Sequence, residues 1–307
     1  MPDRHPQAKL FAGFLAGLGL TVALTGCSSS KPAGDASPLR IGAIPDQNPE
    51  KLNRLYDTLS DELTEQLNVP VMYVPVSNYA AAVSAFRSGS LDLVWFGGLT
   101  GVQARLQTPG SQVLAQRDID AEFTSVFIAH GASGLKPITS SDQLVQLKGK
   151  RFAFGSESST SGRLMPQYFM KQNGITPEDF AGGRPGFSGS HDATIAVVQS
   201  GAYEAGALNS QVWESHVEDG RVDADKVAVI WRTPAYADYH WVAGADLDQR
   251  YGDGFTNRLQ QALIAINPDT ERRRTVLDLF GAEAFIPAVD GDYVAIEAVG
   301  RELGKIR

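Results

Sequence analysis

From Leu39 onward, strand-like and helix-like segments alternate along the chain, and this alternation limits the possible folds more than any other feature of the sequence. The apolar runs 39–44 and 91–96 have the length and composition of buried strands. Between them, leucines recur at helical spacing, at Leu52, Leu55, Leu59, Leu63 and Leu67. The pattern predicts an α/β architecture with largely parallel sheets.

The alternation resumes in the second half of the chain. Helices are expected over 164–173 and 191–200, strands over 205–208 and 226–231, and a mainly helical segment over the last 50 residues or so. We therefore predict two sheets, with the chain crossing between them near 123–125 and again near 234–241. About 280 residues remain after the N-terminal segment, enough for two domains.

The N-terminal segment is interpreted as an export signal. Arg4 and Lys9 precede an uncharged apolar stretch, Leu10–Leu24, that is too short for a comfortable membrane span. The stretch ends in Leu-Thr-Gly-Cys27, which resembles the lipobox of lipoproteins. That resemblance implies a signal peptide over 1–26, a lipid on Cys27 and a flexible Ser-, Pro- and Gly-rich tether over 27–38. The alternative is an ordinary cleaved signal that happens to contain a cysteine.

Cysteine and charge content exclude several classes of protein. Cys27 is the only cysteine, so the chain has no internal disulfide and no thiol catalysis. The net charge is −8, and removing Asp3, Arg4 and Lys9 with the signal, a net +1, leaves about −9. An acidic chain is a poor nucleic-acid binder. Any anion must therefore be held by local donors, since the overall field repels it.

Two short polar stretches nevertheless predict an anion site. Ser159-Thr160-Ser161-Gly162 follows an apolar strand-like run and opens a helix-like run, and Gly189-Ser190-His191 precedes a second helix. The start of a helix offers free backbone N–H groups to an anion, and hydroxyls and an imidazole add donors. A helix cap requires only one hydroxyl, so three in succession favour a ligand role.

With these segments in place, the chain resembles the phosphate-, phosphite- and phosphonate-binding periplasmic proteins of ABC importers. The resemblance rests on six motifs in order: Ile41-Gly42-Ala43-Ile44-Pro45, Asn78-Tyr79-Ala80, the segment 88–97, the segment 147–150, the segment 159–166 and the segment 187–193. It implies a type II periplasmic binding protein, two-lobed and α/β, with two mixed sheets and a two-strand hinge. Lobe 1 would span 39–123 plus 240–307, and lobe 2 would span 124–239.

The resemblance also implies which residues bind the ligand. The phosphonyl-binding positions fall on Ser159, Thr160, Ser161 and His191, and an aromatic contact falls on Tyr79. Phe123 stands where the family has a tyrosine, and Trp95, Asp238 and Tyr239 complete the expected ligand-binding set. Aminophosphonate binders of the family hold the ligand's amine with two carboxylates. The first position carries Gln211, which has no charge, and the second falls on either Asp238 or Tyr239, so we expect a small ligand without a cationic tail.

Phosphite is the predicted ligand, because the Asp238-Tyr239 and 206–209 stretches are most similar to the phosphite-binding branch. An aromatic face at the P–H corner would leave the fourth oxygen of phosphate without a partner. Asp238 would add discrimination through the protonation state of the ligand. The alternatives are a binder of methylphosphonate, another phosphonate or phosphate, and a protein that senses an oxyanion for a signalling partner.

The remaining expectations concern chemistry and partners. The chain has no Gly-x-Ser-x-Gly, phosphate-loop or His-Glu-x-x-His motif, and its five histidines lack metal-ligand spacing, so we expect no enzyme, metal or cofactor. Asp46 is interpreted as turn chemistry and Arg163 as part of a solvated helix face. The implied partners are an ABC permease and its ATPase. The protein is expected to be monomeric, extracytoplasmic or periplasmic, and lipid-anchored.

Overall fold

The computed structural model describes residues 37–307, and Ala36–Arg307 form one compact unit. The predicted signal peptide over 1–26, the lipid site at Cys27 and most of the tether over 27–38 lie outside the described residues. Among the helices that are described, none combines the length and hydropathy that a membrane span requires.

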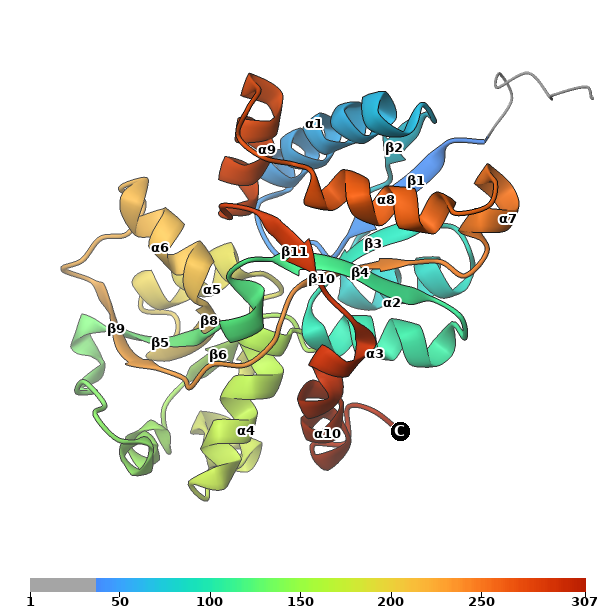
Figure 1. The fold of residues 1–307 in the computed structure, drawn as a ribbon. Coiled ribbons are helices and arrows are strands. Elements are labelled where there is room, and N and C mark those ends of the chain that lie inside the picture. The colour runs from blue at the N-terminus through green and yellow to red at the C-terminus, as the bar shows by residue number, and fades with distance from the viewer. Residues whose placement is uncertain (1–36) are drawn as a thin grey trace, which may run out of the picture. The chain divides into compact units, whose positions relative to one another are not determined.

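The first lobe is built on a mixed six-stranded sheet in the order β11-β4-β10-β3-β1-β2 (Figure 1). Its strands are β1 (Leu39–Ala43), β2 (Val71–Tyr73), β3 (Leu93–Phe96), β4 (Gln112–Arg117), β10 (His240–Ala243) and β11 (Phe285–Pro287). Strand β1 is parallel to β2 and β3, whereas β10 lies antiparallel between β3 and β4.

The second lobe is built on a mixed five-stranded sheet in the order β7-β6-β8-β5-β9. Its strands are β5 (Ser125–His130), β6 (Phe152–Phe154), β7 (Gly186–Phe187), β8 (Ala205–Asn209) and β9 (Val227–Arg232). Strand β5 is antiparallel to both β8 and β9, and β6 is parallel to β7 and β8. Alternate β5 side chains belong to two separate apolar clusters, Phe127 to one and Val126 and Ile128 to the other, so both faces of this sheet are covered.

The helices follow the strands as the alternation predicts. The first lobe carries α1 (Pro49–Leu67), α2 (Tyr79–Arg87), α3 (Gly98–Gln107), α7 (Leu247–Tyr251), α8 (Phe255–Ile264), α9 (Glu271–Phe280) and α10 (Val294–Glu302). The second lobe carries α4 (Met165–Gln172), α5 (His191–Gln199) and α6 (Ser210–Glu218). Asn48 caps α1 and Asn78 caps α2, each accepting hydrogen bonds from amides of the first turn.

The expectation of largely parallel sheets was wrong. Five strand pairs are antiparallel and four are parallel. The antiparallel pairs all involve strands next to the two crossings or the C-terminal return. A strand that enters from the other lobe needs no covering crossover helix, so nothing forces it to run parallel to its neighbours.

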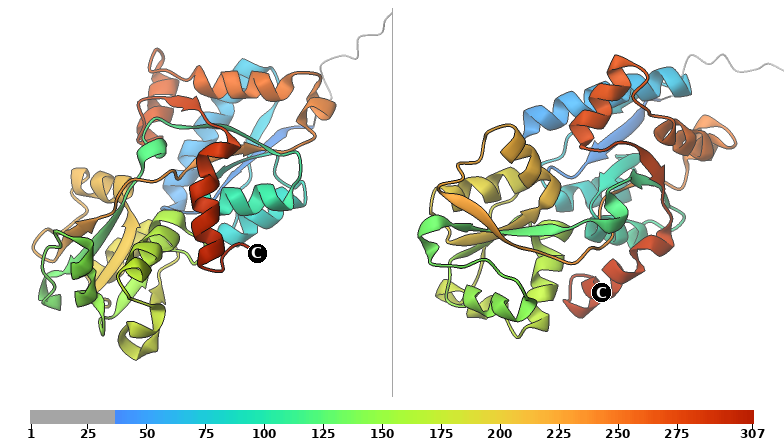
Figure 2. Two further views of the ribbon diagram at one scale, coloured as in Figure 1. Left: turned by 60° about the horizontal axis from the view of Figure 1, so that its bottom comes forward. Right: turned by 60° about the vertical axis from the view of Figure 1, so that its left-hand side comes forward.

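Two segments cross between the lobes, one from β4 to β5 and one from β9 to β10, as Figure 2 shows. They pair with each other at a single bridge, where the Phe123 amide donates to the Tyr236 carbonyl at 2.8 Å and the Tyr236 amide donates back at 2.9 Å. The crossing segments thus form a short paired hinge beside the space between the lobes.

Candidate anion-binding site

Helix N-termini from both lobes meet at the face between the lobes. Helices α2 and α3 begin there in the first lobe, and α5 and the π-helical turn Thr160–Leu164, which leads into α4, begin there in the second. The lobes touch at these ends, because the Leu99 amide donates to Thr160 Oγ1 at 2.9 Å and the His191 amide donates to the Asp46 carbonyl at 2.9 Å. Each such end carries a partial positive charge, so together they favour an anion despite the acidic chain.

The Ser159–Ser161 hydroxyls have three different environments. Ser159 caps the π turn, because its Oγ accepts from the Gly162 amide at 2.9 Å. Thr160 Oγ1 accepts from Leu99 across the cleft, as described above. Ser161 Oγ is buried and has no hydrogen-bond partner within residues 37–307. Helix capping therefore accounts for Ser159 alone. Because the oxygens of Ser159 and Thr160 only accept in these bonds, their hydroxyl protons remain available to donate.

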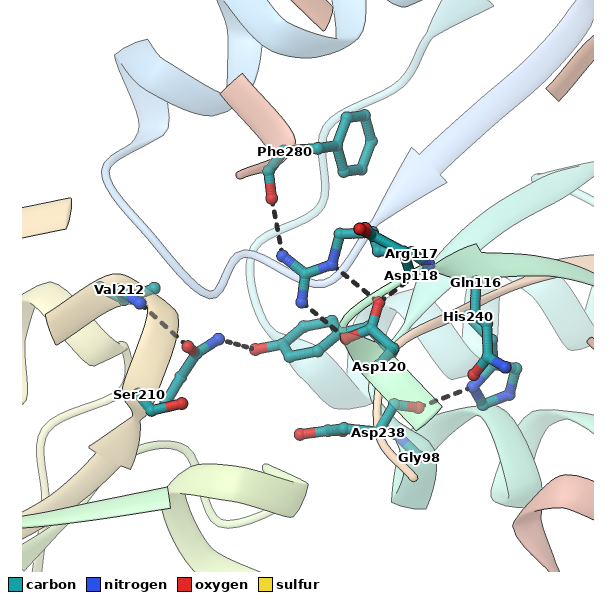
Figure 3. A network of polar contacts seen from close by, with 12 residues as sticks. Gly98, Gln116, Arg117, Asp118, Asp120, Ser210, Val212, Asp238, His240 and Phe280 are labelled. Carbon is teal, nitrogen blue, oxygen red and sulfur yellow. Dashed lines mark hydrogen bonds and ion pairs between the residues drawn. The ribbon is translucent and has the colours of Figure 1, made fainter. Parts of the chain in front are cut away.

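Asp238 caps a helix that is distant in sequence. Its Oδ1 accepts from the Gly98 amide, the first residue of α3, at 2.9 Å. A Cβ placed on Gly97 would lie 3.2 Å from both Asp238 Oδ1 and Thr160 Oγ1, so these two predicted site residues converge on one point. Figure 3 shows the Asp238 side chain extending away from the ring of His240.

Burial raises the pKa of Asp238 to about 7, even though the hydrogen bond from Gly98 stabilises the charged form. Desolvation therefore exceeds the attraction of the helix N-terminus. Near neutral pH this carboxyl group is present in both protonation states, and can donate a hydrogen bond in one and accept in the other. Its Oδ2 is buried without a partner among the described residues.

Three buried polar atoms of predicted site residues make no well-aligned hydrogen bond in the described part of the chain: Tyr79 Oη, Ser161 Oγ and Asp238 Oδ2. The hydroxyls of Thr160 and Ser161 nevertheless lie close enough to Asp238 to oppose the rise of its pKa, so the atoms form one cluster. Tyr79 is the first residue of α2 and lines a groove between the lobes together with Ser158 and Gly189. Buried polar groups normally find partners, since leaving one unpaired costs about 1–3 kcal/mol. Three such atoms on separate elements indicate a site in which a polar ligand supplies the missing partners.

His191 is buried, and its ring is held from two sides. Its Nδ1 accepts from the Asn209 amide at 3.4 Å, which places the ring proton on Nε2, and Nε2 then donates to Tyr239 Oη at 3.1 Å. Burial lowers the pKa of His191 to about 4, so the ring is neutral at physiological pH. An anion that takes the Nε2 proton has to compete with Tyr239 for it.

The predicted aromatic residues form one stack. Trp95 and Tyr239 lie with ring centroids 5.8 Å apart and an interplanar angle of 17°. Phe123 meets Tyr239 edge-on at 5.6 Å, and the guanidinium of Arg117 lies 5.0 Å from the Tyr239 ring centroid. All four predicted aromatic side chains, including Tyr79, are buried. Trp95, Phe123 and Tyr239 together form a buried aromatic wall.

Sequence reasoning missed the role of Asp46. Asp46 does lie in a turn, because its amide donates to the Ile44 carbonyl at 3.0 Å, but it is also only 4 % exposed and its carbonyl receives the His191 amide from the other lobe. Burial raises the pKa of Asp46 to about 6, and a hydrogen bond from Tyr239 opposes the rise. A usable signal was present, since Asp46 follows the carboxyl end of β1, where open α/β sheets bind ligands.

Asn209 was also missed. Its amide nitrogen Nδ2 donates to Tyr239 Oη at 3.0 Å, while its Oδ1 caps α6 by accepting from Val212 at 3.0 Å. Gln211, two residues later, lies against Gly281 of the first lobe, and a Cβ on that glycine would overlap its side-chain amide. Gly281 has φ +63°, which glycine adopts without strain.

Two lobes, a paired hinge and an anion-favouring cleft define the class of type II periplasmic binding proteins. Residues 41–293 match the family described as ABC transporter, phosphonate, periplasmic substrate-binding protein. The chain belongs to this family, as its motifs predicted. It is a substrate-binding component of an ABC importer, works outside the cytoplasm, and has a small ligand and an ABC permease with its ATPase as partners.

Individual relatives agree with this assignment. PhnD1 of Prochlorococcus marinus strain MIT 9301, a probable ABC transporter phosphite-binding protein, is 51 % identical over 279 residues, which cover 91 % of this chain and 94 % of that protein. The solved structure of PhnD1 with methylphosphonate has a TM-score of 0.86 at 52 % identity, covering 87 % of this chain and 98 % of that one. The phosphate-import protein PhnD of Mycolicibacterium smegmatis is 26 % identical, covering 68 % of this chain and 67 % of that protein.

Proposed function

We propose that this chain captures phosphite between its lobes and delivers it to the importer. The observation that carries the proposal is the set of unpartnered atoms Tyr79 Oη, Ser161 Oγ and Asp238 Oδ2 among helix N-termini. Tyr79 and Ser161 supply hydroxyl donors for two phosphorus-bound oxygens, and Asp238 supplies a group that shares a proton with the ligand. The remaining predicted residues, Ser159, Thr160 and His191, add hydroxyl and imidazole donors nearby.

The buried aromatic side chains of Trp95, Phe123 and Tyr239 support a ligand with a minimal, apolar fourth substituent. A P–H bond needs no hydrogen-bond partner, so the aromatic wall of Trp95, Phe123 and Tyr239 accepts it. The fourth oxygen of phosphate would lose a hydrogen bond there, at roughly 1–3 kcal/mol.

Methylphosphonate is the second candidate ligand. PhnD1, which shares half of its residues with this chain, has been solved with methylphosphonate. A methyl group is apolar and compact, so the same aromatic wall tolerates it better than the charged tail of an aminophosphonate. We place it after phosphite because a methyl group is bulkier than hydrogen against closely packed aromatic side chains.

Calorimetry on a chain that begins at Ser28 tests the proposal, because Ala36–Arg307 form a compact unit. The titrants are phosphite, phosphate, methylphosphonate and 2-aminoethylphosphonate. Phosphite should bind tightest, with phosphate weaker by about two orders of magnitude. Tightest binding of the aminophosphonate would contradict the proposed ligand, and a lack of binding by all four would overturn the oxyanion site itself.

We further propose the division into lobe 1 (39–123 plus 240–307) and lobe 2 (124–239), a monomeric state, and a lipid anchor on Cys27. Metabolic labelling with a fatty acid should mark the full-length protein in cells and leave Cys27→Ser unlabelled. Equal labelling of the two proteins would overturn the anchor and leave the binding proposal intact.

A further inference from the structure

A second cavity lies on the second lobe, outside the anion-binding site. It has a volume of about 760 Å³, within the range of small-molecule sites. Its walls come from the start of β6, from the π turn and from the loop before β7, and they include Arg151, Glu157, Arg163, Arg184 and Phe187. We call this space the Arg163 cavity.

Arg163 is the unusual residue in this cavity. Its interpretation as part of a solvated helix face was wrong, since the residue is only 6 % exposed. Its guanidinium carbon lies 4.3 Å from the ring centroid of Phe154 and 5.1 Å from that of Phe187. Nε and Nη1 are buried and make no hydrogen bond to any residue within 37–307. Burial lowers the pKa of Arg163 to about 10, so the side chain remains charged at neutral pH.

The other charges around the cavity are also mainly positive. Arg184 is exposed and belongs to none of the ion pairs formed within the described residues. Arg151 lies 3.7 Å from Glu204, a weak pair that Lys150 shares. Glu157 is the one acidic residue of the lining. Three arginines and one glutamate give a net charge of +2 in a chain whose overall charge is −8.

Two aromatic rings complete the walls. Phe187 is 40 % exposed, which is unusual for a large apolar side chain. Tyr203 lies directly against the backbone of Gly186, where a Cβ would overlap its ring. A flat apolar group can therefore lie against ring faces while an attached anionic group meets the arginines, a combination typical of organic-anion sites.

We propose that the Arg163 cavity is a second binding site, which takes a small organic oxyanion: a phosphate or carboxylate group carried on a flat ring. Arg163 and Arg184 bind the oxyanion, and Phe187 and Tyr203 contact the ring. The site is separate from the proposed phosphite site, although Glu157 and Phe187 also line the groove that leads to Tyr79.

Phenyl phosphate is the probe for an NMR titration of the chain from Ser28, saturated with phosphite so that the cleft is occupied. The readouts are the Arg163 Nε–Hε resonance and the amides of Gly182, Gly183 and Gly186. These signals should shift saturably. Benzoate as a second probe distinguishes a carboxylate site from a phosphate site, and inorganic phosphate, which lacks the ring, should bind at least about threefold more weakly.

Two variants and a control complete the test. Arg184→Ala, on an exposed residue, and Arg163→Lys, which keeps the charge but not the planar fork, should each weaken phenyl phosphate at least about tenfold. Arg258→Ala is the matched control, because Arg258 is an exposed arginine 5.4 Å from the Phe255 ring, far along the chain in α8, and should change nothing.

Unsaturable shifts, or equal affinity in the parent and both variants, would overturn the second site. In a second titration begun without phosphite, displacement of bound phenyl phosphate by phosphite would show that the probe occupies the cleft, and would also overturn the second site. If phosphite fails to bind at all, the proposed function fails, whereas the same titration without phosphite still decides the Arg163 cavity.

Discussion

Two buried polar clusters meet at the hinge and use their polar atoms in opposite ways. In the first, the Arg117 guanidinium donates twice to Asp120, at 2.7 Å each, and once to the Phe280 carbonyl at 2.7 Å (Figure 3). In the second, Tyr79, Ser161 and Asp238 each keep a buried atom without a partner in the described chain. The clusters are joined directly, because the Asp238 amide donates to the Asp120 carbonyl at 3.0 Å.

The difference separates structural polar groups from binding groups. Burial alone would lower the pKa of Arg117, but the Asp120 carboxylate raises it above its ordinary value, so the pair stays ionised. The hydrogen bonds of the Arg117–Asp120 pair are all made to protein atoms, and the pair holds the hinge end of β4 in place. The second cluster is equally buried but chemically incomplete, which is the property expected of a ligand site.

The largest expected effect comes from breaking the paired cluster. Asp120→Asn leaves the Arg117 charge buried without its counterion and should lower the free energy of unfolding by about 3–5 kcal/mol. Urea denaturation measures it. The control is Glu297→Gln in the exposed pair with Arg301, where the cost should be about 0.5 kcal/mol or less. A cost for Asp120→Asn as small as that of the control would show that the pair has no structural role.

The second prediction separates the two serines of the anion segment. Ser161→Ala removes an unpartnered hydroxyl, so stability should be unchanged while phosphite affinity falls about 10–100-fold. Ser159→Ala removes a helix cap and should also cost about 1 kcal/mol of stability. Urea denaturation and calorimetry on both variants distinguish the roles. Loss of stability without loss of affinity in Ser161→Ala would contradict the assignment.

The third prediction concerns pH. Because burial raises the pKa of Asp238 to about 7, the folded state binds more protons than the unfolded state between about pH 4 and 7. The free energy of unfolding of the parent therefore falls as pH rises through about 7. Asp238→Asn should remove this fall, so the variant should be more stable than the parent by at least about 1 kcal/mol near pH 8.5. Melting temperatures at about pH 5 and 8.5 measure it.

The affinity for phosphite should depend on pH in the same direction as the stability does. One proton is shared between Asp238 and the ligand, so phosphite affinity of the parent should fall as pH rises through about 7. In Asp238→Asn the side-chain amide donates at every pH. The variant should therefore lose the pH dependence of affinity that comes from Asp238 and keep only the part that comes from the ligand's own titration. An unchanged pH profile of affinity in the variant would exclude Asp238 from the site.

The smallest expected effect concerns an exposed contact that joins the lobes. Lys171 of α4 and Glu302 of α10 form an ion pair at 2.9 Å, and both are about 40 % exposed. Lys171→Glu should weaken phosphite binding less than about fivefold at low salt, and the exchange Lys171→Glu with Glu302→Lys should restore it. A larger loss that persists at high salt would show that this pair contributes more to closure than the buried cluster does.

Local residues predicted most of the fold and the segments that make up the candidate site. The apolar runs and the crossing points were readable because each depends on neighbouring residues. The Ser159–Ser161 segment was readable for the same reason. The mixed strand directions were not predicted from periodicity, because direction depends on which lobe a strand comes from and not on its own composition.

Asp46, Arg163 and Asn209 needed the tertiary structure. Each carries a polar side chain next to a turn or helix start, a pattern that usually indicates a solvated residue. Whether such a side chain is buried depends on which distant segments of the chain pack over it. For Asp46 that segment is the start of α5, about 145 residues later in the chain.

The sequence by itself determined the α/β alternation, the family and the segments that line the cleft, because periodicity, caps and motifs are local properties. Only the tertiary structure decided which hydroxyl is a cap and which is unpartnered, which carboxyl group has a raised pKa, and that Arg163 is buried. Those properties depend on desolvation and on contacts that exist only in the folded chain, some within one lobe and some between the two lobes.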